Sequence, residues 1–308
     1  MKIGIIGLGD IAQKAYLPVM AQLEGIELVF CTRNLKTLTQ LAQRYRVNEY
    51  CQDYRTLLNM QVDAVMIHAA TQVHVEIAAF FLEQGIPTFV DKPLADSAEE
   101  VESLYQLAGK VNQPLYVGFN RRHIPLFNQH VPELGHHQCG ELLALRWEKH
   151  RHAQPGDVRT FIFDDFIHPL DSVNLDARDG LEDVHITWQK QGHQLGRLDV
   201  QWQAGETLLH ASMNRQFGMT TETVSADYLN RGVRFDSFVA GRDWRQGQEC
   251  RLMLPDWTPM LTSKGFEAMI HDWIRVVEQG RLPHKVAERN VASHRLADAV
   301  CRKIEQLF

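Results

Sequence analysis

Two short segments of the chain carry residue types that move protons in enzymes. In Asp91-Lys92-Pro93, the proline fixes the local backbone and disfavours the helical region for the lysine, which directs its amine. In the helical pattern of residues 163–171, Asp164 and His168 stand four residues apart on one face. A carboxylate beside an imidazole orients the ring and stabilises its protonated form, as a general base requires. Taken separately, the first segment also fits a surface lysine at a turn, and the second an exposed ion pair.

A glycine-rich turn near the N-terminus predicts a phosphate-binding site. The motif G-x-G-x-x-A spans residues 7–12, between an apolar strand and a helical pattern. Its first glycine permits a tight turn, its second lets the backbone approach a pyrophosphate, and the small alanine lets helix and strand pack closely. A plain strand–helix turn that favours glycine is the alternative. The predicted dinucleotide contacts here are Gly7, Gly9, Asp10, Ile11 and Ala12.

The residues after the second apolar run predict which nucleotide binds. An Asp or Glu about 20 residues after the glycine turn would hold the ribose 2′-OH of NAD. The chain instead has Cys31-Thr32-Arg33-Asn34 there, with no carboxylate. Thr32 and Arg33 suit the 2′-phosphate of NADP, because a guanidinium pairs well with phosphate. We therefore predict NAD(P) as cofactor, with NADP favoured over NAD; the alternative is that Arg33 is a solvated loop residue.

Alternating elements in the first 120 residues predict an α/β domain with a doubly wound parallel sheet. Short apolar runs alternate with segments of helical spacing. Near-continuous apolar strands between helices are typical of a parallel sheet covered on both faces. The predicted strands are Lys2–Ile6, Glu27–Cys31, Asp63–Ile67, Pro87–Val90 and Leu115–Val117.

A change of period near residue 120 predicts a second domain of the α+β class. Residues 164–174 have a helical pattern, most of 184–253 alternates with period two, and two helical patterns close the chain. We expect a largely antiparallel open sheet with helices. The predicted domains are an NAD(P)-binding Rossmann domain at 1–120 and a substrate-binding and oligomerisation domain at 121–308. The C-terminal helix is a candidate to pack back on the first domain.

Composition narrows the class of protein. The 308 residues suit two domains, and the net charge of −6 is unlike the basic field that nucleic-acid binding requires. No apolar run approaches the roughly 20 residues that span a bilayer, and the N-terminus lacks the features of a signal peptide. The five cysteines form no C-x-x-C pair, so we expect reduced thiols and a cytoplasmic protein. We expect no metal site, because the histidines and cysteines show no metal-ligand spacing.

The motifs together resemble those of one family. The glycine turn, Asp91-Lys92-Pro93, the segment Gly118–Arg122 and the D-x-x-x-H pair are similar to motifs of the glucose–fructose oxidoreductase/inositol dehydrogenase (Gfo/Idh/MocA) family. The segment Ala70–His74 also matches the family's Thr-Pro-x-x-x-His-type loop, although Gln72 replaces the usual proline. The stretches Val-Asp-Lys-Pro-Leu-Ala and Asp-Asp-Phe-Ile-His most resemble the bacterial subgroup labelled virulence factor MviM.

The resemblance implies a catalytic set of Lys92, Asp164 and His168. His168 would take the proton from a substrate hydroxyl while hydride leaves the same carbon for the nicotinamide. Lys92 would stabilise the developing alkoxide, and Asp164 would orient Lys92 or His168. The chain has Asp91 where the family commonly has glutamate. The further cofactor contacts that the resemblance implies are Ala70, Thr71, His74, Asp91 and Lys92.

The resemblance also implies substrate contacts. His150 matches a substrate-contacting histidine of inositol dehydrogenases, and His168 and Asn120 are the other implied contacts. Alternation along a strand would send His150 and His152 to one face, where a metal would lack a third ligand. The two arginines after Asn120 either hold the domains together or meet an anionic substrate group. We expect a structural role for at least one of them.

The motifs, together with the family that they resemble, imply an NAD(P)-dependent dehydrogenase or reductase acting on a sugar, polyol or related small molecule. The alternative is a catalytically silent NAD(P)-binding sensor or regulator of the same fold, which would be expected to lack Lys92 or the D-x-x-x-H pair. We expect a homodimer or homotetramer that associates through the C-terminal sheet, with no nucleic-acid or membrane partner.

Overall fold

The computed structural model describes residues 1–307 and divides into two compact units. One contains Met1–Gly118 and Phe266–Ala287; the other contains Phe119–Gly265 and the chain from Glu288 onward. The predicted division placed all of residues 121–308 in the second domain, with the C-terminal helix as the candidate to return to the first. The segment that belongs to the first unit is instead 266–287, which precedes most of that helix.

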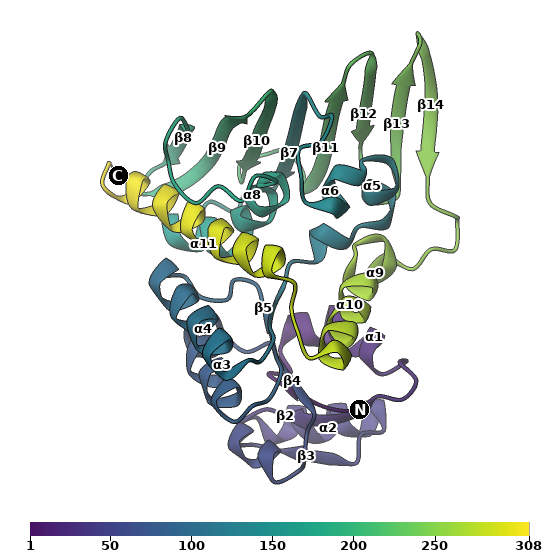
Figure 1. Ribbon diagram of the computed structural model, residues 1–308, viewed down its shortest axis with the longest axis vertical. Coiled ribbons are helices and arrows are strands. Elements are labelled where there is room, and N and C mark those ends of the chain that lie inside the picture. Colours follow the sequence, from purple (N-terminus) through teal and green to yellow (C-terminus); the bar gives the residue numbers. More distant parts are fainter. Residues whose placement is uncertain (308) are drawn as a thin grey trace. The chain divides into compact units, whose positions relative to one another are not determined.

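The first unit is built on a six-stranded parallel sheet (Figure 1). The order β3-β2-β1-β4-β5-β6 confirms the predicted doubly wound fold, whose switch point lies between β1 and β4. β3 was not predicted, because it has only three residues and none of them is fully buried. The strands are β1 (Lys2–Ile6), β2 (Glu27–Cys31), β3 (Glu49–Cys51), β4 (Ala64–Ile67), β5 (Thr88–Asp91) and β6 (Leu115–Gly118).

Helices connect these strands, and one of them, α2 (Leu35–Tyr45), begins at a side-chain cap. The side chain of Asn34 accepts a hydrogen bond from Thr37 N–H at 3.0 Å, which starts α2 directly after the loop that carries Arg33. The helix after the glycine turn begins as a π-helical segment, η1, and continues as α1. The elements are η1 (Ala12–Tyr16), α1 (Leu17–Met20), α2 (Leu35–Tyr45), the 3₁₀ turns η2 (Tyr54–Leu58) and η3 (Thr71–Val73), α3 (His74–Glu83), α4 (Ala98–Val111) and α10 (Phe266–Gln279).

Aromatic packing explains why residues 266–287 belong to the first unit. The ring of Trp273, on α10, is fully buried and lies 5.9 Å from Phe89 and 5.7 Å from Tyr116. Tyr116 Oη also donates a hydrogen bond to Asp272 Oδ2 at 2.8 Å. A buried tryptophan removes roughly 150–250 Å² from water, which fixes α10 against β5 and β6. These partners are more than 150 residues apart in the chain, so no local pattern reports the contact.

The second unit is built on an eight-stranded sheet in the order β14-β13-β12-β11-β7-β10-β9-β8. β7 and β10 are parallel and every other neighbouring pair is antiparallel, which confirms the predicted sheet type. The region with period two forms β8 to β14. The strands are β7 (Ala144–His150), β8 (His185–Gln191), β9 (Gln194–Ala204), β10 (Thr207–Asn214), β11 (Thr221–Tyr228), β12 (Arg231–Phe235), β13 (Ala240–Arg245) and β14 (Gln248–Met253).

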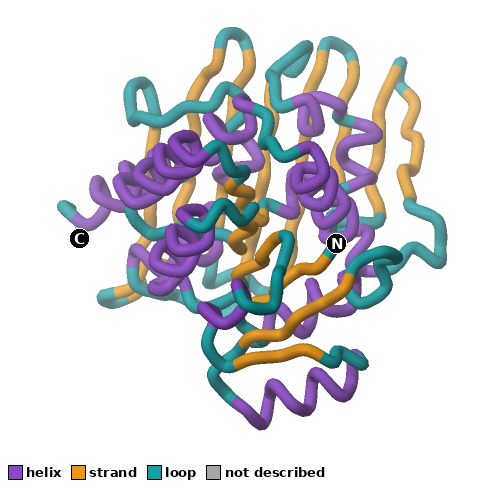
Figure 2. The backbone as a smooth tube through the Cα atoms, turned by 60° about the horizontal axis from the view of Figure 1, so that its bottom comes forward, coloured by secondary structure: helices purple, strands orange, loops and turns teal. Residues whose placement is uncertain are grey.

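The helices of the second unit gather on one face of its strands (Figure 2). The predicted helix at 164–174 starts earlier, at α7, and continues through the π-helical segment η5 into α8. No helix within residues 1–307 combines the length and the apolar composition needed to cross a membrane. The elements are η4 (Asn120–His123), α5 (Pro125–His130), α6 (Pro132–His136), α7 (Val158–Thr160), η5 (Phe161–Phe166), α8 (Ile167–Val173), α9 (Met260–Ser263) and α11 (His284–Glu305).

The eight-stranded sheet has an apolar face and a polar face. Along β9, Leu198, Val200 and Trp202 are buried, whereas the alternate residues Asp199 and Gln201 are partly exposed. α8 packs on β7 and β10 at the apolar face. We call the opposite, polar face the outer face of the sheet.

Candidate functional site

The turn after β1 has the shape that the glycine motif predicts. Gly7 has a φ of +87°, and a Cβ there would stand 2.6 Å from Ala69 N. Gly7 N–H donates to Cys31 O at 2.9 Å, which ties the turn to the end of β2. A Cβ on Gly9 would meet nothing within 4 Å, and Ala12 is fully buried. The turn is closed at its first glycine and open at its second, which fits a pyrophosphate lying against the Gly9 backbone.

The other nucleotide contacts predicted from the glycine turn and β2 have little or no burial. Asp10 forms an exposed ion pair with Lys14 at 2.8 Å, and Ile11 is 39% exposed. Beyond β2, Thr32 is partly buried and Arg33 is exposed. The Arg33 guanidinium forms no ion pair with any of residues 1–307. It is therefore available to a phosphate group.

The carboxylate of Asp91 holds the turn that carries Lys92. Its Oδ1 accepts hydrogen bonds from Tyr16 Oη at 2.8 Å and from Lys92 N–H at 2.9 Å. Burial raises the pKa of Asp91, against the opposing effects of the Lys92 charge and the Tyr16 hydrogen bond. A Cβ on Gly118 would stand 2.9 Å from Tyr16 Oη, so the glycine at the end of β6 leaves room for this pair. The Lys92–Pro93 peptide bond is cis.

His74 links the loop after β4 to the same turn. Its Nδ1 lies 2.9 Å from Pro93 O and its Nε2 lies 3.0 Å from Ala69 O. Both partners are carbonyl oxygens, so both hydrogen bonds form together only when each ring nitrogen carries a proton. Ala70 and Thr71 belong to the loop that His74 fastens. The sequence predicts that His74 contacts the cofactor. In the structure, both nitrogens of its ring form hydrogen bonds with backbone carbonyl groups.

His68, which sequence reasoning missed, lies directly after β4. Its ring centroid is 3.9 Å from that of Tyr16, and only 4% of the residue is exposed. Burial, with a smaller contribution from His74, lowers the pKa of His68 to about 3, so the ring is neutral. Neither ring nitrogen has a hydrogen-bond partner among residues 1–307. The signal in the sequence that could have identified His68 is a polar residue directly after a buried strand.

The segment formed by η5 and α8 carries three aspartates in different surroundings. Asp164 is exposed, whereas the side chains of Asp165 and Asp171 are 8% and 1% exposed. His168 lies between the two buried ones in the chain and is itself buried. The predicted Asp164–His168 pair therefore combines an exposed carboxylate with a buried imidazole.

Asp165 is the centre of a buried ion cluster that was not predicted. Its carboxylate accepts from Arg151 Nε at 2.9 Å and Nη2 at 3.0 Å, and it pairs with Lys149 Nζ and with Arg215 Nη2 at 3.2 Å. Burial raises the pKa of Asp165, but Lys149 and Arg151 outweigh burial and hold it well below its usual range. Burial, together with the charge of Arg121, lowers the pKa of Lys149 to about 7.

Asp171 is a second buried anchor on the same segment. It accepts from Arg122 Nε at 2.9 Å and Nη2 at 2.6 Å, and from Ser293 Oγ at 2.7 Å. Burial raises the pKa of Asp171, but the charges of Arg122 and Arg289 outweigh burial and lower the pKa to about 2. Arg122 also stacks 4.6 Å from the Phe119 ring. This is the structural role expected for one of the two arginines.

Asn120 and Arg121 have partners inside the second unit. Asn120 Nδ2 donates to Lys264 O at 2.8 Å, and Asn120 Oδ1 accepts from Arg121 Nη1 at 3.1 Å. Arg121 donates to both oxygens of Glu222, at 3.3 and 3.0 Å. Asn120 is only 2% exposed. Its amide group therefore positions the chain around Lys264, and its contact with a substrate stays a prediction.

Adjacent residues of β7 point to opposite faces of the sheet. Lys149 faces η5, where it meets Asp165, so His150 faces the outer side. There His150 Nδ1 accepts from Asn214 N–H at 3.0 Å, and its ring lies 4.7 Å from that of Phe217. The structure thus brings Lys149, and not the predicted His150, to the face on which the helix of His168 packs.

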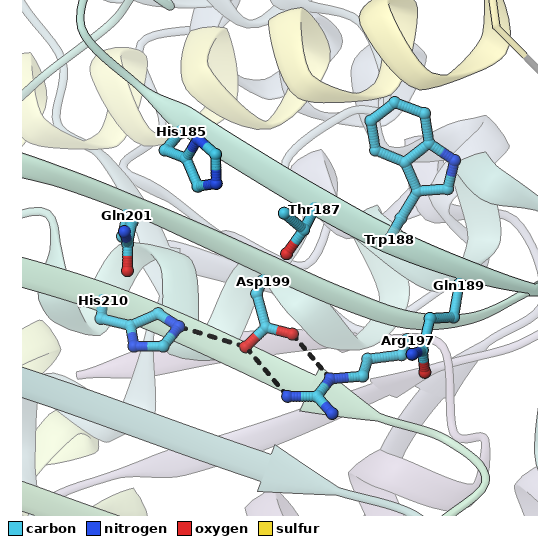
Figure 3. A pocket seen from close by; sticks show the side chains of 8 residues that line it. All are labelled: His185, Thr187, Trp188, Gln189, Arg197, Asp199, Gln201 and His210. Carbon is cyan, nitrogen blue, oxygen red and sulfur yellow. Dashed lines mark hydrogen bonds and ion pairs between the residues drawn. The ribbon is translucent and has the colours of Figure 1, made fainter.

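The outer face holds a pocket over β8, β9 and β10 (Figure 3). Asp199 accepts from Arg197 Nε at 2.7 Å and pairs with His210 Nε2 at 3.1 Å. Burial raises the pKa of Asp199, but His210 and Arg197 outweigh burial and lower it. The Asp199 carboxylate is thus already paired with Arg197 and His210 within the pocket. The lining residues are His185, Thr187, Trp188, Gln189, Arg197, Asp199, Gln201 and His210.

Several of the predicted residues form one group in each unit. In the first, Gly7 packs on Ala69, whose carbonyl bonds His74, and His74 in turn bonds the turn of Lys92. In the second, Asp164 and His168 share one helical segment. Each group is thus held together by contacts within its own unit.

Comparison with known proteins gives concordant matches. A family model described as an oxidoreductase family with an NAD-binding Rossmann fold matches residues 1–119. The crystal structure of a Gfo/Idh/MocA family oxidoreductase from Vibrio cholerae is 65% identical, with a TM-score of 0.99, and covers 100% of this chain and 99% of that one. The dehydrogenase MviM from Clostridium difficile is 27% identical, with a TM-score of 0.87 and the same coverage. Inositol 2-dehydrogenase of Corynebacterium glutamicum is 25% identical over 72% of this chain and 68% of its own. These matches confirm the resemblance and its subgroup.

Gly7→Ala should destabilise the protein, because the added Cβ would stand 2.6 Å from a backbone nitrogen at a positive φ. We expect the free energy of unfolding, measured with urea, to fall by about 1–3 kcal/mol. Gly9→Ala is the matched control, since its Cβ would meet nothing within 4 Å. An equal loss in both variants would contradict the assignment of the strained position to Gly7.

Asp171→Asn should leave buried guanidinium groups without their counter-ion. We expect the free energy of unfolding at neutral pH to fall by about 3–5 kcal/mol. Asp10→Asn, which removes an exposed ion pair, should cost at most about 1 kcal/mol.

The Asp171 carboxylate should also contribute to acid unfolding. Its pKa of about 2 in the folded chain lies below the ordinary value of 3.8. The stabilisation is therefore complete above the ordinary value and is lost as the pH falls towards the lower one. Stability measured across this range should depend less on pH in Asp171→Asn than in the wild type, and identical profiles would refute the assignment.

Proposed function

Because the chain belongs to the Gfo/Idh/MocA family of oxidoreductases, we propose that it is an NAD(P)-dependent dehydrogenase or reductase acting on a sugar, polyol or related small molecule. The observation that carries the proposal is the turn of Asp91-Lys92-Pro93, which hydrogen bonds with Tyr16 and His74 hold at the carboxyl edge of the parallel sheet. This edge is where open α/β sheets bind their ligands. The relationship to inositol 2-dehydrogenase supports the substrate class.

The cofactor would lie along the carboxyl edge of the first sheet. Gly7 and Gly9 would face the pyrophosphate, with Asp10, Ile11 and Ala12 at the start of the helix. Thr32 and Arg33 would take a 2′-phosphate, which supports NADP over NAD. The remaining proposed contacts are Ala70, Thr71, His74, Asp91 and Lys92, of which His74 and Asp91 act by holding their loops.

The chemistry divides between two groups of residues. The nicotinamide, when bound, supplies a hydride acceptor. His168 accepts the proton of the substrate hydroxyl, and the Lys92 amine donates a hydrogen bond to that oxygen as its negative charge grows. Asp164 orients Lys92 or His168. Asn120 and His168 are the proposed substrate contacts, and for the third, His150, the outer-face position favours Lys149 in its place.

We also propose that the chain forms a homodimer or homotetramer through the outer face of the eight-stranded sheet. Support comes from the ion pairs along the strands of this face, such as Arg197–Asp199 on β9 and Arg146–Glu148 on β7, which offer a second copy a polar surface. The molar mass from sedimentation equilibrium decides this point. The cytoplasmic location stays a prediction, with which the five free thiols agree.

Lys92→Met and His168→Asn should each lower kcat/KM by about 10²–10⁴-fold, the usual contribution of a positioned acid or base. Activity is measured as nicotinamide absorbance change in a screen of inositols, sugars and polyols with NAD and NADP. Lys14→Met, which removes an exposed lysine, is the matched control.

Cofactor binding distinguishes lost chemistry from a lost fold. NADPH affinity, measured by fluorescence titration, should stay close to wild type in His168→Asn. A wild-type protein that binds NADPH but turns over nothing in the screen would support a silent sensor and count against an enzyme.

Arg33→Ala should lower the affinity for NADPH about tenfold or more while leaving the affinity for NADH close to wild type, because the guanidinium would bind the 2′-phosphate, which NADH lacks. Both affinities are measured by fluorescence titration. Arg44→Ala, on the exposed side of α2, is the control and should change neither. An unchanged ratio of the two affinities in Arg33→Ala would remove the preference for NADP.

A further inference from the structure

A buried group of charges beside η5 holds more positive than negative charge. We call it the Asp165 cluster. Its basic members outnumber its acidic members by two when Lys149 is protonated. Excess charge in a buried place is costly unless an ion of opposite sign compensates it. The cluster consists of Arg121, Lys149, Arg151, Asp165, Arg215 and Glu222.

Both oxygens of each acid in the cluster already have hydrogen-bond or ion-pair partners. Asp165 Oδ1 meets Arg151 and Lys149, and its Oδ2 meets Arg151 and Arg215. Glu222 accepts from Arg121 at both oxygens and from Trp147 Nε1 at 2.8 Å. No rotation of these acids can compensate the remaining positive charge.

The cluster has both an unused donor and an opening. The Arg215 side chain is nine-tenths buried, and its Nε has no hydrogen-bond partner among residues 1–307. The Arg151 side chain, which binds the same carboxylate, is 32% exposed. The cluster is therefore partly exposed to solvent at Arg151.

The Asp171 cluster shows the contrasting, structural case. Its arginines, Arg122 and Arg289, also outnumber their acid, but each side chain is only 4% exposed. That cluster is sealed, and we assign it to stability. The Asp165 cluster differs because one of its arginine side chains, that of Arg151, is partly exposed to solvent.

The Asp165 cluster includes a residue of the helical segment that carries His168, the proposed general base. Asp165 precedes His168 by three residues on one helical segment. Both residues are buried, so the central carboxylate of the cluster and the imidazole are carried by neighbouring buried positions of the same segment. Arg121, one of the two arginines for which the sequence left an anionic partner open, is part of the cluster.

We propose that the substrate carries a carboxylate or phosphate group, and that Arg151 and Arg215 bind it while His168 acts on a hydroxyl a few bonds away. The inference rests on the proposed dehydrogenase function and adds the class of substrate to it. Guanidinium groups suit both anions, because their paired N–H donors match two oxygens. Lys149 contributes a further donor to the same site.

Direct binding tests the proposal without turnover. Wild-type protein with NADPH is titrated calorimetrically with glucose, glucuronate and glucose 6-phosphate, a series that differs in its anionic group. We expect at least one anion to bind about tenfold or more tightly than glucose, and Arg151→Gln to remove most of that difference. Tighter glucuronate assigns a carboxylate, and tighter glucose 6-phosphate a phosphate. Binding of neither anion above glucose would overturn the proposal.

Matched variants separate the site from general charge effects. Arg295→Gln removes an arginine of an exposed ion pair in the same unit and should bind all three probes as wild type does. Arg151→Lys keeps the charge but not the paired donors, and should bind the anion with intermediate affinity. Circular dichroism and thermal unfolding establish that each variant is folded. Equal losses in Arg151→Gln and Arg295→Gln would also overturn the proposal.

Turnover of the same three compounds separates this inference from the proposed function. Oxidation of an anionic compound with a higher kcat/KM than glucose supports both. Tight anion binding that depends on Arg151, without turnover of any compound in the wider screen, supports the anion site and counts against the dehydrogenase. Faster oxidation of glucose than of both anions supports the dehydrogenase and overturns the anion site.

Discussion

The hydrogen bonds that Asp91 Oδ1 accepts from Tyr16 Oη and Lys92 N–H decide where the lysine leaves the parallel sheet. Several features exist to make them possible. Gly118 supplies the space beside the pair, since a Cβ there would stand 3.1 Å from the carboxylate. His74 holds the other side of the turn through Pro93 O. The shorter acid, Asp91, thus has a defined task here, which is to fix the turn by bonding its own backbone neighbour.

In the second unit, buried carboxylates likewise hold a helical segment in place. Asp165 and Asp171 are buried, and each is surrounded by cations that hold its pKa below the usual range. They fix both sides of the segment that carries His168, while Asp164 stays exposed. Acidic residues that are adjacent in the chain therefore serve different purposes. Their roles follow from which partners the fold supplies, because the side chains are chemically identical.

The fold was predictable where neighbouring residues determine it. Apolar runs, period-two alternation and the G-x-G-x-x-A turn depend on residues close together in the chain, and they indicated both sheets. β3 was not predicted because it has only three residues, two partly buried and one exposed, which are too few to show a period. The packing of α10 in the first unit was not predicted, because Trp273 contacts Phe89 and Tyr116, which are distant from it in the chain. The motif residues of the site were found by resemblance, which compares residue types and not surroundings.

By itself the sequence determined the two sheet types, the glycine turn, the Lys92 motif and the D-x-x-x-H pair, because each depends on spacing within one element. The tertiary structure decided which side chains meet. His150 and Lys149 are adjacent in β7, yet only the packing of η5 shows that Lys149 faces Asp165. His74 became a bridge between two loops, and Arg122 a buried anchor, through partners distant in the chain. Burial and long-range charge pairing set these roles, and neither is encoded in local spacing.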